Sequence, residues 1–591
     1  MTSESPSARR RRHAGRVSAW VLGGLLLLVI IGGVWIGVRG ILAYQHLDNA
    51  RTSAAGAAEV LADPAKAPAL IERISVDTSA ARVLTDDIIW RAGEQLPWIG
   101  PQLAAVSTVS SALDDVASHA LDPLATVAST FSLDSIRPQN GAIDVSLFAD
   151  IAPAALSSTE ALDNARDDIA GIDTTVLLGP VRDAVAQVSG LVTEAYTGVD
   201  AVRRASTLMP AMLGADGPRD YLIVFQNNAE WRSLGGIVGA MLQLHTDNGR
   251  LTLTAQGSSE DFPAYEATVM PLSSEEEQIF GAQPARWVQN VTQIPDFTRG
   301  APIAREMWLR EKGVDVDGVI SLDPVALSYV LEATGPVSLP TGDTLTSANA
   351  VDLLLNGVYQ RYEQPREQDA FFAAAASAVF ASLTSGTASP SDLLSSMARA
   401  GYENRLLLWS ADAAEQAVLD GTSLQGALPE TDAEVTSFGV YANDATASKM
   451  DYYQSLETVT TWCGADRGQL TVTIRNDAPS DAANLPTYIT GGGSHGVPPG
   501  EIKTVTYVYL PQDSTLVSST AAGDRESSGF GTGIDADRDV LIWTTQLAPG
   551  ESMTLTVQVR TPRTPQIVTR STPTIDIPAI PRIASGCDIP G

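Results

Sequence analysis

The sequence predicts a multidomain chain with a transmembrane helix, an α-helical stalk, an α/β domain and a C-terminal antiparallel β-sandwich. Three observations support this order. An uncharged apolar run lies near the N-terminus, an alanine-rich region punctuated by prolines follows it, and apolar residues recur at every second position towards the C-terminus. Because one hydrophobic core rarely grows beyond roughly 250 to 300 residues, a chain of 591 residues is expected to divide into several domains.

The N-terminal segment predicts a membrane anchor. Residues 1–16 form a basic tail, and residues 17–38 run without a charge. At about 1.5 Å per residue, this run can cross a bilayer as one helix. The arginines before it, and the single Arg39 after it, predict a cytoplasmic N-terminus and an extracytoplasmic bulk. A cleaved signal peptide is the alternative, but no A-x-A site follows the run cleanly. A single-pass protein of the cell membrane is therefore expected.

The overall charge excludes one class of partner. The formal net charge is −31 and the isoelectric point is about 4.4, so the chain should repel nucleic acids. Two explanations of the acidity remain open: general solubility of an exported protein, or cation binding and exclusion from acidic wall polymers.

Residues 43–217 predict the helical stalk. The clearest helix has valines and one alanine at alternating spacings of four and three, a seam typical of helices that pack on other helices; they are Val181, Val185, Val188, Val192, Ala195, Val199 and Val202. A peptide- or lipid-binding groove between the helices is the alternative use of such a seam. The break at residues 96–101 predicts a tight corner or a segment near the membrane face.

Residues 218–460 predict the α/β domain. Tyr221 to Phe225 has the length and bulk of a buried strand, and Asn227-Asn228 begins a polar loop that ends at Gly235-Gly236. A second strand ends at Leu322, where Asp323 is suited to cap a helix and Pro324 to begin it. Strand, helix and strand in this order favour a layered sheet.

Two stretches of this domain resemble known families. The pattern N-N-x-E-x-R-x-x-G-G at residues 227–236, with VDGVISLDP at 316–324 and the segment 355–368, resembles a domain-of-unknown-function family, number 4012, of actinobacterial membrane proteins. Residues 313–339 also resemble the LytR-CpsA-Psr family, enzymes that transfer glycopolymers from polyprenyl-pyrophosphate lipids to the cell wall. The second resemblance implies a LytR-CpsA-Psr-like fold and the handling of a polyprenyl-linked glycopolymer.

This resemblance implies a phosphate site. Phosphate groups are best held by arginine, whose planar guanidinium is always charged. Arg232, Arg361 and Arg366 match arginines of the family, and Gln368 falls where the family has a further polar residue. A Mg²⁺ ion is implied if the chain is a phosphotransferase.

The chain departs from the enzyme pattern at two places. Leu234-Gly235 stands where the enzymes have Asp-Thr, and Ser259-Glu260-Asp261 stands where they have Pro-Arg-Asp. One carboxylate and one arginine are therefore missing, although Glu230, Glu260 or Asp261 could supply the acid. These departures favour an alternative function, a non-catalytic structural or scaffolding envelope protein that binds partners through its stalk or sandwich. Whether the chain is an enzyme is left open.

Each candidate residue also has a structural explanation. Arg232 could pair with Glu230, and Arg361 and Arg366 could balance nearby glutamates on a solvated face. The two glycines could serve a tight turn, and Asn227 and Asn228 could cap the strand end. The five histidines show no metal-ligand spacing, so no metal site is predicted from them.

The C-terminal region predicts a sandwich over residues 465–562, of immunoglobulin-like type, with a proline-rich tail over 563–591. Its expected role is spacing or adhesion. Cys463 and Cys587 are the only cysteines, and in an extracytoplasmic location they could form a disulfide or remain free.

Overall fold

A computed structural model describes residues 6–55, 67–130, 133–526, 529–576, 582–583 and 587. The chain divides into two compact units. We call them the helical unit, Met1–Ser135 with Ser146–Pro210, and the sheet unit, Ile136–Val145 with Ala211–Gly591. The ten residues 136–145 interrupt the predicted stalk, because Ala142 forms a bridge with Arg250 of the sheet unit.

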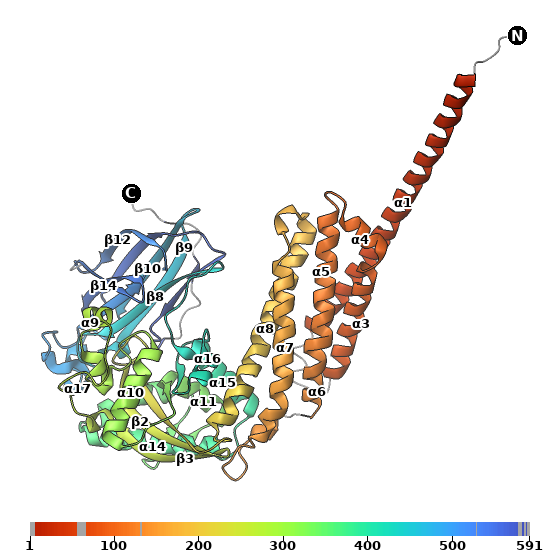
Figure 1. Cartoon of the computed structure of the whole chain (residues 1–591). Coiled ribbons are helices and arrows are strands. Elements are labelled where there is room, and N and C mark those ends of the chain that lie inside the picture. The colour runs from red at the N-terminus through yellow and green to blue at the C-terminus, as the bar shows by residue number, and fades with distance from the viewer. Residues whose placement is uncertain are drawn as a thin grey trace. The chain divides into compact units, whose positions relative to one another are not determined.

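The helical unit begins with one long helix, α1 (Pro6–Ala55), which contains the predicted membrane run. Its stretch Leu26–Ala54 is long and apolar enough to cross a membrane, judged by length and composition. The remaining helices are α3 (Ala67–Thr85), α4 (Ile88–Glu94), α5 (Gly100–Val116), α6 (Asp122–Thr130), α7 (Ser146–Ala170) and α8 (Gly179–Met212) (Figure 1).

The valine seam of α8 packs as expected over most of its length. Val185 and Val192 are buried in a cluster with residues of α5 and α7, and Val199 packs partly against it. Ala195 is exposed and Val202 is 43% exposed, so the predicted seam is interrupted at Ala195 and ends before Val202.

The α/β part of the sheet unit contains a five-stranded mixed sheet with the order β3-β2-β1-β4-β7. β1 and β4 are parallel, and the other neighbours are antiparallel. The strands are β1 (Arg219–Asn227), β2 (Ile237–Asp247), β3 (Arg250–Ser258), β4 (Gly318–Leu322) and β7 (Leu406–Ser410). The helices of this part are α9 (Ser274–Phe280), α10 (Phe297–Lys312), α11 (Pro324–Thr334), α12 (Ala350–Asp352), α13 (Val358–Arg361), α14 (Pro365–Thr384), α15 (Pro390–Tyr402) and α16 (Ala413–Leu419), and a small hairpin joins β5 (Val337–Ser338) to β6 (Thr344–Leu345).

The predicted cap of α11 is confirmed. Asp323 Oδ1 accepts a hydrogen bond from Ala326 N at 2.7 Å, Pro324 is the first helical residue, and Gly335 follows the helix with φ 78°. A left-handed φ at this position suits glycine, which has no Cβ.

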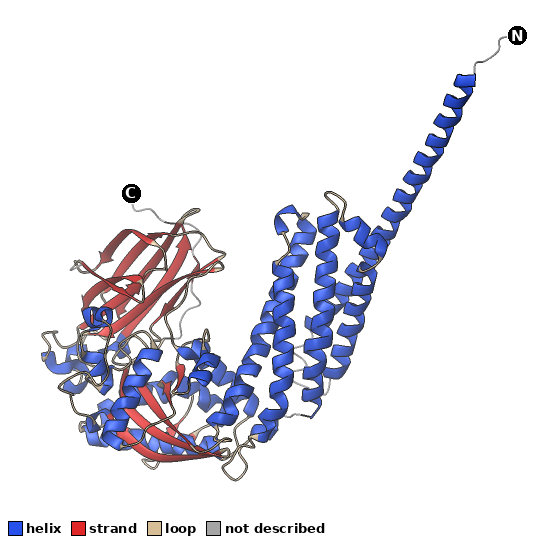
Figure 2. Cartoon of the chain, in the orientation of Figure 1, coloured by secondary structure: helices blue, strands red, loops and turns tan. Residues whose placement is uncertain are grey.

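The C-terminal part contains two five-stranded sheets whose inner residues form one core (Figure 2). One has the order β12-β15-β10-β9-β17, the other β13-β14-β11-β8-β16. The strands are β8 (Val435–Asp444), β9 (Gln454–Trp462), β10 (Arg467–Asn476), β11 (Ile502–Tyr509), β12 (Thr515–Gly523), β13 (Phe530–Asp535), β14 (Arg538–Leu547), β15 (Ser552–Arg560), β16 (Gln566–Ser571) and β17 (Arg582–Ile583), with the short helix α17 (Thr487–Thr490) between β10 and β11.

This assembly extends beyond the predicted residues 465–562 at both ends. β8 and β9 come from the stretch that the sequence assigns to the α/β domain, and β16, from the proline-rich tail, pairs in parallel with β8. β8 is buried on both faces, because Tyr441 on its outer side packs with Phe280 and Ile294 of the α/β part. A strand buried on both faces lacks the alternation on which the sequence boundary was based.

Candidate functional site

The candidate site lies where the parallel strands β1 and β4 end. In open α/β sheets, ligands bind at the carboxyl ends of parallel strands. β1 ends at Asn227, and the turn after it is held by the Asn227 side chain: Oδ1 accepts from Ala229 N at 3.1 Å. Asn227 Nδ2 donates to Tyr359 Oη at 2.9 Å and to Glu230 Oε2 at 3.1 Å. Asn227 therefore caps the strand end, one of the two uses that the sequence suggests.

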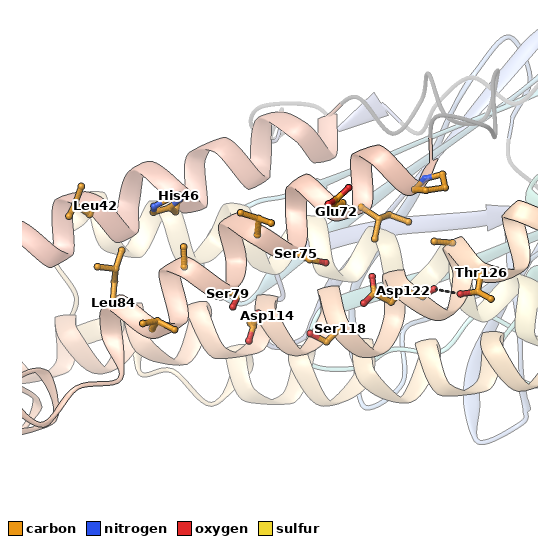
Figure 3. A pocket seen from close by; sticks show the side chains of 16 residues that line it. Leu42, His46, Glu72, Ser75, Ser79, Leu84, Asp114, Ser118, Asp122 and Thr126 are labelled. Carbon is orange, nitrogen blue, oxygen red and sulfur yellow. Dashed lines mark hydrogen bonds between the residues drawn. The ribbon is translucent and has the colours of Figure 1, made fainter.

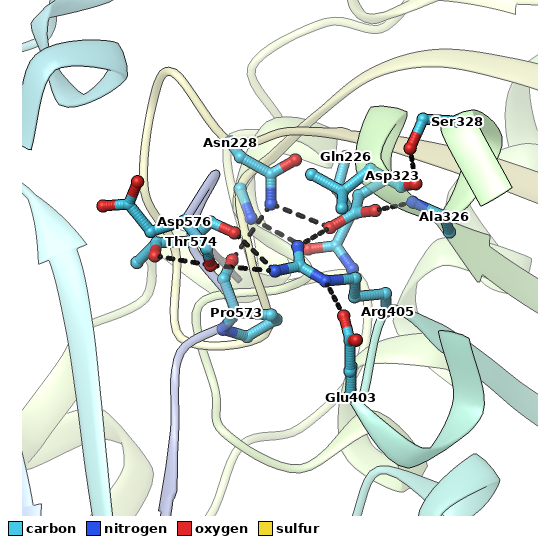
Figure 4. Close-up of polar contacts among 12 residues, drawn as sticks. Gln226, Asn228, Asp323, Ala326, Ser328, Glu403, Arg405, Pro573, Thr574 and Asp576 are labelled. Carbon is cyan, nitrogen blue, oxygen red and sulfur yellow. Dashed lines mark hydrogen bonds and ion pairs between the residues drawn. The ribbon is translucent and has the colours of Figure 1, made fainter. Parts of the chain in front are cut away.

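A buried polar network joins the ends of both strands (Figure 4). Asp323, directly after β4, accepts through Oδ2 from Asn228 Nδ2 at 3.1 Å and from Arg405 Nη1 at 2.8 Å. Arg405 Nε donates to Glu403 Oε2 at 2.8 Å. The Arg405 side chain is fully buried and pairs with both carboxylates, and Glu403 also pairs with Arg399 at 3.1 Å. Burial acts to raise the pKa of Glu403, but hydrogen bonds from Arg405 and Tyr329 lower it below its usual value.

The chain's own tail closes this network. Residues 572–576 follow β16, and we call them the tail clasp. Their main-chain carbonyls accept three hydrogen bonds: Pro573 O from Asn228 at 3.0 Å, Thr574 O from Arg405 at 2.7 Å and Asp576 O from Arg405 at 3.2 Å. The Thr572 hydroxyl donates to Ser233 O at 3.0 Å. The position at which a ligand would meet Asn228 and Arg405 is thus occupied by backbone.

Glu230 takes part in a second cluster and pairs with Lys449, not with Arg232. The Lys449 ammonium contacts Glu230 Oε2 and lies 4.5 Å from the ring centre of Tyr359 and 4.8 Å from that of Tyr488. An ammonium over aromatic faces is stabilised by the ring quadrupole. Lys449 is 7% exposed and Tyr359 is buried, whereas Tyr488 is 41% exposed, so the cation is buried beneath a ring that reaches solvent.

Arg232 points to neutral acceptors. Its Nε donates to Asn290 Oδ1 at 2.9 Å, and its Nη1 donates to Trp231 O at 2.7 Å and Asp444 O at 3.4 Å. These contacts place Arg232 between the loop after β1 and the end of β8. The neighbouring Ser233 is fully buried and hydrogen-bonds to Asn443.

Two buried carboxyls lie near Arg232. Burial raises the pKa of Asp444, although the positive charge of Arg232 acts against this. Burial raises the pKa of Asp451 well above its usual value, and the charge of Asp444 adds to the effect. Asp451 Oδ2 accepts from Trp231 N at 2.7 Å, while its Oδ1 has no hydrogen-bond partner among the described residues.

Replacement of Asp451 by asparagine should change how stability depends on pH. A carboxyl whose pKa is raised on folding binds more protons when folded, so its contribution to stability falls as pH rises above its unfolded value near 3.8. Asp451→Asn removes this loss and keeps an acceptor for Trp231 N. The free energy of unfolding, measured against pH, should therefore favour the variant increasingly as pH rises from about 4. Asp466→Asn, at an exposed carboxylate, is the control. If the difference in free energy of unfolding between the wild type and Asp451→Asn does not vary with pH, the expectation is wrong.

The two glycines serve the tight turn. Gly235 has φ 138°, and Gly236 N donates to Gln226 Oε1 at 2.9 Å. A Cβ added at Gly236 would lie 2.0 Å from Asn227 O, a main-chain atom that cannot move freely. Close approach of two backbone segments explains the glycine at this position.

We expect Gly236→Ala to destabilise the protein by about 1–3 kcal/mol, the usual cost of overpacking. Gly239→Ala is a matched control on the neighbouring strand β2, because nothing lies within 4 Å of a Cβ added there. Urea unfolding should show a loss for the first variant only. Equal stability of the two variants would show that the turn relaxes without cost.

The remaining predicted site residues lie apart from the network. Arg361 Nη1 pairs with Asp343 Oδ2 at 2.7 Å on the surface, and Arg366 is exposed in the first turn of α14. Gln368 is buried and donates to Tyr362 O at 2.8 Å. Asp261 pairs with Lys312 at 3.0 Å, and Glu260 is exposed beside it.

The three candidate arginines are not brought to a common partner. Within the described ranges, no hydrogen-bond or ion-pair partner is shared by Arg232, Arg361 and Arg366.

The family comparison falls on this loop and the two strands. Residues 216–359 match a family model described as a protein of unknown function, DUF4012. The DUF4012 match confirms the resemblance predicted from the Asn227-to-Gly236 pattern. It includes Asn228 and Asp323 but ends before Arg405, Lys449 and the tail clasp. No curated protein matches the chain.

Sequence reasoning missed Arg405 and Lys449. Both lie far along the chain from their partners: Arg405 follows Asp323 by 82 positions, and Lys449 follows Glu230 by 219. The available signal for Arg405 was an arginine placed immediately before a strand of apolar residues, Leu406–Ser410. No group of three or more His, Cys, Asp or Glu side chains is placed to hold a metal ion in the part of the chain that the structure describes.

Cys463 and Cys587 form a disulfide with Cα atoms 5.3 Å apart. It ties the end of the chain to the segment between β9 and β10, beyond the tail clasp. The tail is therefore held at two places.

The helical unit has a groove of about 1180 Å³ along α1, α3, α5 and α6 (Figure 3). Its lining mixes apolar residues such as Leu42 and Leu84 with the acidic Glu72, Asp114 and Asp122. None of the lining residues belongs to α8, so this groove is not formed by the valine seam, and its mixed lining does not single out a ligand.

Proposed function

We propose that this protein is a non-catalytic structural or scaffolding protein of the cell envelope, anchored by α1 with its N-terminus in the cytoplasm. Its α/β part is then a LytR-CpsA-Psr-like scaffold without the transfer reaction. The observation that carries the proposal is the tail clasp. Its main-chain carbonyls lie at the carboxyl ends of β1 and β4, where they accept hydrogen bonds from the side chains of Asn228 and Arg405.

The charges support this reading. A phosphate group needs cations with free donors. Arg405 is already flanked by two carboxylates, and Lys449 is paired with Glu230. Arg399 also pairs with Glu403, so the cations of this cluster are matched by carboxylates, and an added anion would meet a paired cation both at Arg405 and at Lys449.

The location is supported by two features. The basic residues before the apolar run favour a cytoplasmic N-terminus. The disulfide between Cys463 and Cys587 suits an oxidising compartment outside the cytoplasm. On this proposal, the helical unit and the immunoglobulin-like sandwich present surfaces to protein partners.

A second candidate function is the handling of a glycopolymer on a polyprenyl-phosphate carrier. Arg366 favours it, because this side chain is exposed in the first turn of α14 and makes no hydrogen bond or ion pair in the described structure. A cation at a helix N-terminus is a suitable place for a phosphate. On this reading, Arg232 and Arg361 would have to exchange their present partners.

Native mass spectrometry of the full chain with added undecaprenyl phosphate separates the two. The wild type is compared with an Arg232→Ala/Arg361→Ala/Arg366→Ala variant and with Arg475→Ala, a control at an exposed ion pair. The scaffolding proposal expects no carrier adduct on any of them. A carrier adduct on the wild type and the control that is lost in the triple variant would refute it and justify a transfer assay with Mg²⁺.

A positive test uses an exposed apolar residue of the sandwich. Ile534 on β13 is 56% exposed. A photoreactive amino acid at this position should give one or a few discrete protein adducts in intact cells if the sandwich recruits partners. Absence of adducts at Ile534 and at the exposed Val517, on β12 of the other sheet, would count against recruitment by this part of the chain.

A further inference from the structure

We propose that the helical unit has a second membrane contact, an apolar corner that inserts into the outer leaflet beside α1. The corner consists of exposed apolar side chains from the start of α4, from the α4–α5 connection and from the loop between α7 and α8. They are Ile88, Leu96, Trp98, Ile99, Val176 and Leu178, with Trp98 91%, Ile88 84% and Leu178 64% exposed. The inference rests on membrane anchoring by α1 and not on the rest of the proposed function.

The corner lies at the level of the apolar run of α1. Figure 1 shows α4 against α1 at the end of the bundle from which α1 projects. Trp35 Nε1 donates to Asp87 Oδ2 at 2.9 Å, and a Cβ added at Gly93 would lie 2.8 Å from the Ile36 side chain. α4 therefore packs directly on the last turns of the uncharged run.

The contact reaches further along α1. A Cβ added at Gly32 would lie 4.0 Å from the Ile89 side chain. Gly32 is six residues before Val38, the end of the uncharged run. At the rise of an α-helix this places Ile89 about 9 Å inside that end. If residues 17–38 cross the bilayer, α4 lies below the outer surface of the membrane.

The first charge after the run is folded into this corner. Arg39 donates to Leu84 O at 2.8 Å and Val83 O at 2.6 Å, and it pairs with Asp87 at 3.0 Å. The charges of Arg39 and Asp87 are thereby neutralised at the level where α1 leaves the membrane. On the exposed side of α4, Arg91 is paired with Asp86. Paired charges lower the cost of placing the corner at the interface.

The apolar side chains are held outward by the backbone. Trp98 has φ 75°, a conformation that is rare for a bulky residue. Gln102 joins the two loops: its Nε2 donates to Val176 O at 3.0 Å and its Oε1 accepts from Leu178 N at 2.9 Å. A fixed group of exposed apolar residues is unfavourable in water, whereas tryptophan and aliphatic residues are favoured at a membrane interface.

Lipid is therefore the occupant that fits best, because the corner is continuous with the surface of α1 that faces lipid. A protein partner is the alternative occupant. It would have to bind at membrane depth beside the anchor.

The test uses the full chain in vesicles of phosphatidylcholine and phosphatidylglycerol. An environment-sensitive fluorophore is attached at Trp98→Cys or, as a control, at Leu156→Cys, an exposed apolar position on α7. Both native cysteines are in the disulfide, so they do not react with the label. Quenching is measured with bromine on the lipid acyl chains and with iodide in the water. Ile99→Cys replaces Trp98→Cys if the latter does not fold.

We expect the fluorophore at the corner to be quenched by brominated lipid and to lose quenching by iodide, and the fluorophore at Leu156 to behave in the opposite way. Equal iodide quenching at the two positions, in protein that floats with the vesicles, would show that the corner lies in water and would overturn the inference. If the chain does not float with the vesicles, α1 is not a membrane anchor, and the inference, which depends on that anchor, is wrong. This outcome would not affect the argument from the tail clasp.

Discussion

Replacement of Arg405 by leucine is expected to destabilise the protein by about 3–5 kcal/mol, the usual cost of removing one partner of a buried ion pair. The change leaves the buried Asp323 carboxylate without its cation and leaves Glu403 paired with Arg399 alone. It also removes the donor of Thr574 O, while Asp576 O keeps only the Thr574 hydroxyl at 3.5 Å. Chemical unfolding followed by the intrinsic fluorescence of the chain measures the loss. The tail clasp should also loosen, so limited proteolysis should cut near residue 576 sooner than in the wild type.

Arg475→Ala is the matched control for this prediction. Arg475 pairs with Asp477 at 2.5 Å, but both side chains are about half exposed. An exposed pair contributes about 0–1 kcal/mol, so this variant should unfold close to the wild type. If Arg405→Leu also unfolds close to the wild type, the network in Figure 4 does not stabilise the fold, and the argument from the tail clasp is lost.

Loss of the disulfide is the second large effect. It closes a loop with a sequence separation of 124 residues. In the chain-entropy model a loop of this size stabilises the folded state by about 4–5 kcal/mol. Cys463→Ser with Cys587→Ser should therefore lower the free energy of unfolding by an amount of this order, through greater freedom of the unfolded chain.

A reducing agent provides the control for the disulfide. It should lower the melting temperature of the wild type to that of the double serine variant and leave the variant unchanged. An unchanged melting temperature in the reduced wild type would show that the tail clasp alone holds the end of the chain.

Local features of the fold could be predicted from the sequence. The strand at Tyr221, the helix cap at Asp323 and the alternation in β10, β11 and β15 depend on residues close together in the chain. Propensity, capping and period-two alternation act over a few residues, so they are visible in the sequence. The Asn227 cap belongs to the same class, because its acceptor and donor are two residues apart.

The partners of the candidate site could not be predicted in this way. One structural explanation of Arg232 paired it with Glu230, two residues away, but Glu230 pairs with Lys449. Arg405 lies beside Asp323 because β7, which follows Arg405, pairs with β4 in the sheet. The distance between the two residues along the chain does not indicate this pairing. β8, which the sequence analysis placed in the α/β domain, pairs with β11 of the C-terminal part, and its burial on both faces removes the alternation that would have indicated this pairing.

The segment Ile136–Val145 also constrains how the chain folds during synthesis. It belongs to the sheet unit, yet it leaves the ribosome before α7 and α8 of the helical unit are complete. Ile143 N donates to Gly249 O at 2.9 Å, and the contact of Asn140 with Arg250 spans 110 residues. The segment therefore remains unpaired while the helices after it leave the ribosome. The helical unit cannot fold from one uninterrupted piece of chain, because residues 136–145 divide it. A protease cut between the units at Pro210 would likewise leave residues 136–145 attached to the half that contains α1 and deprive the other half of this segment.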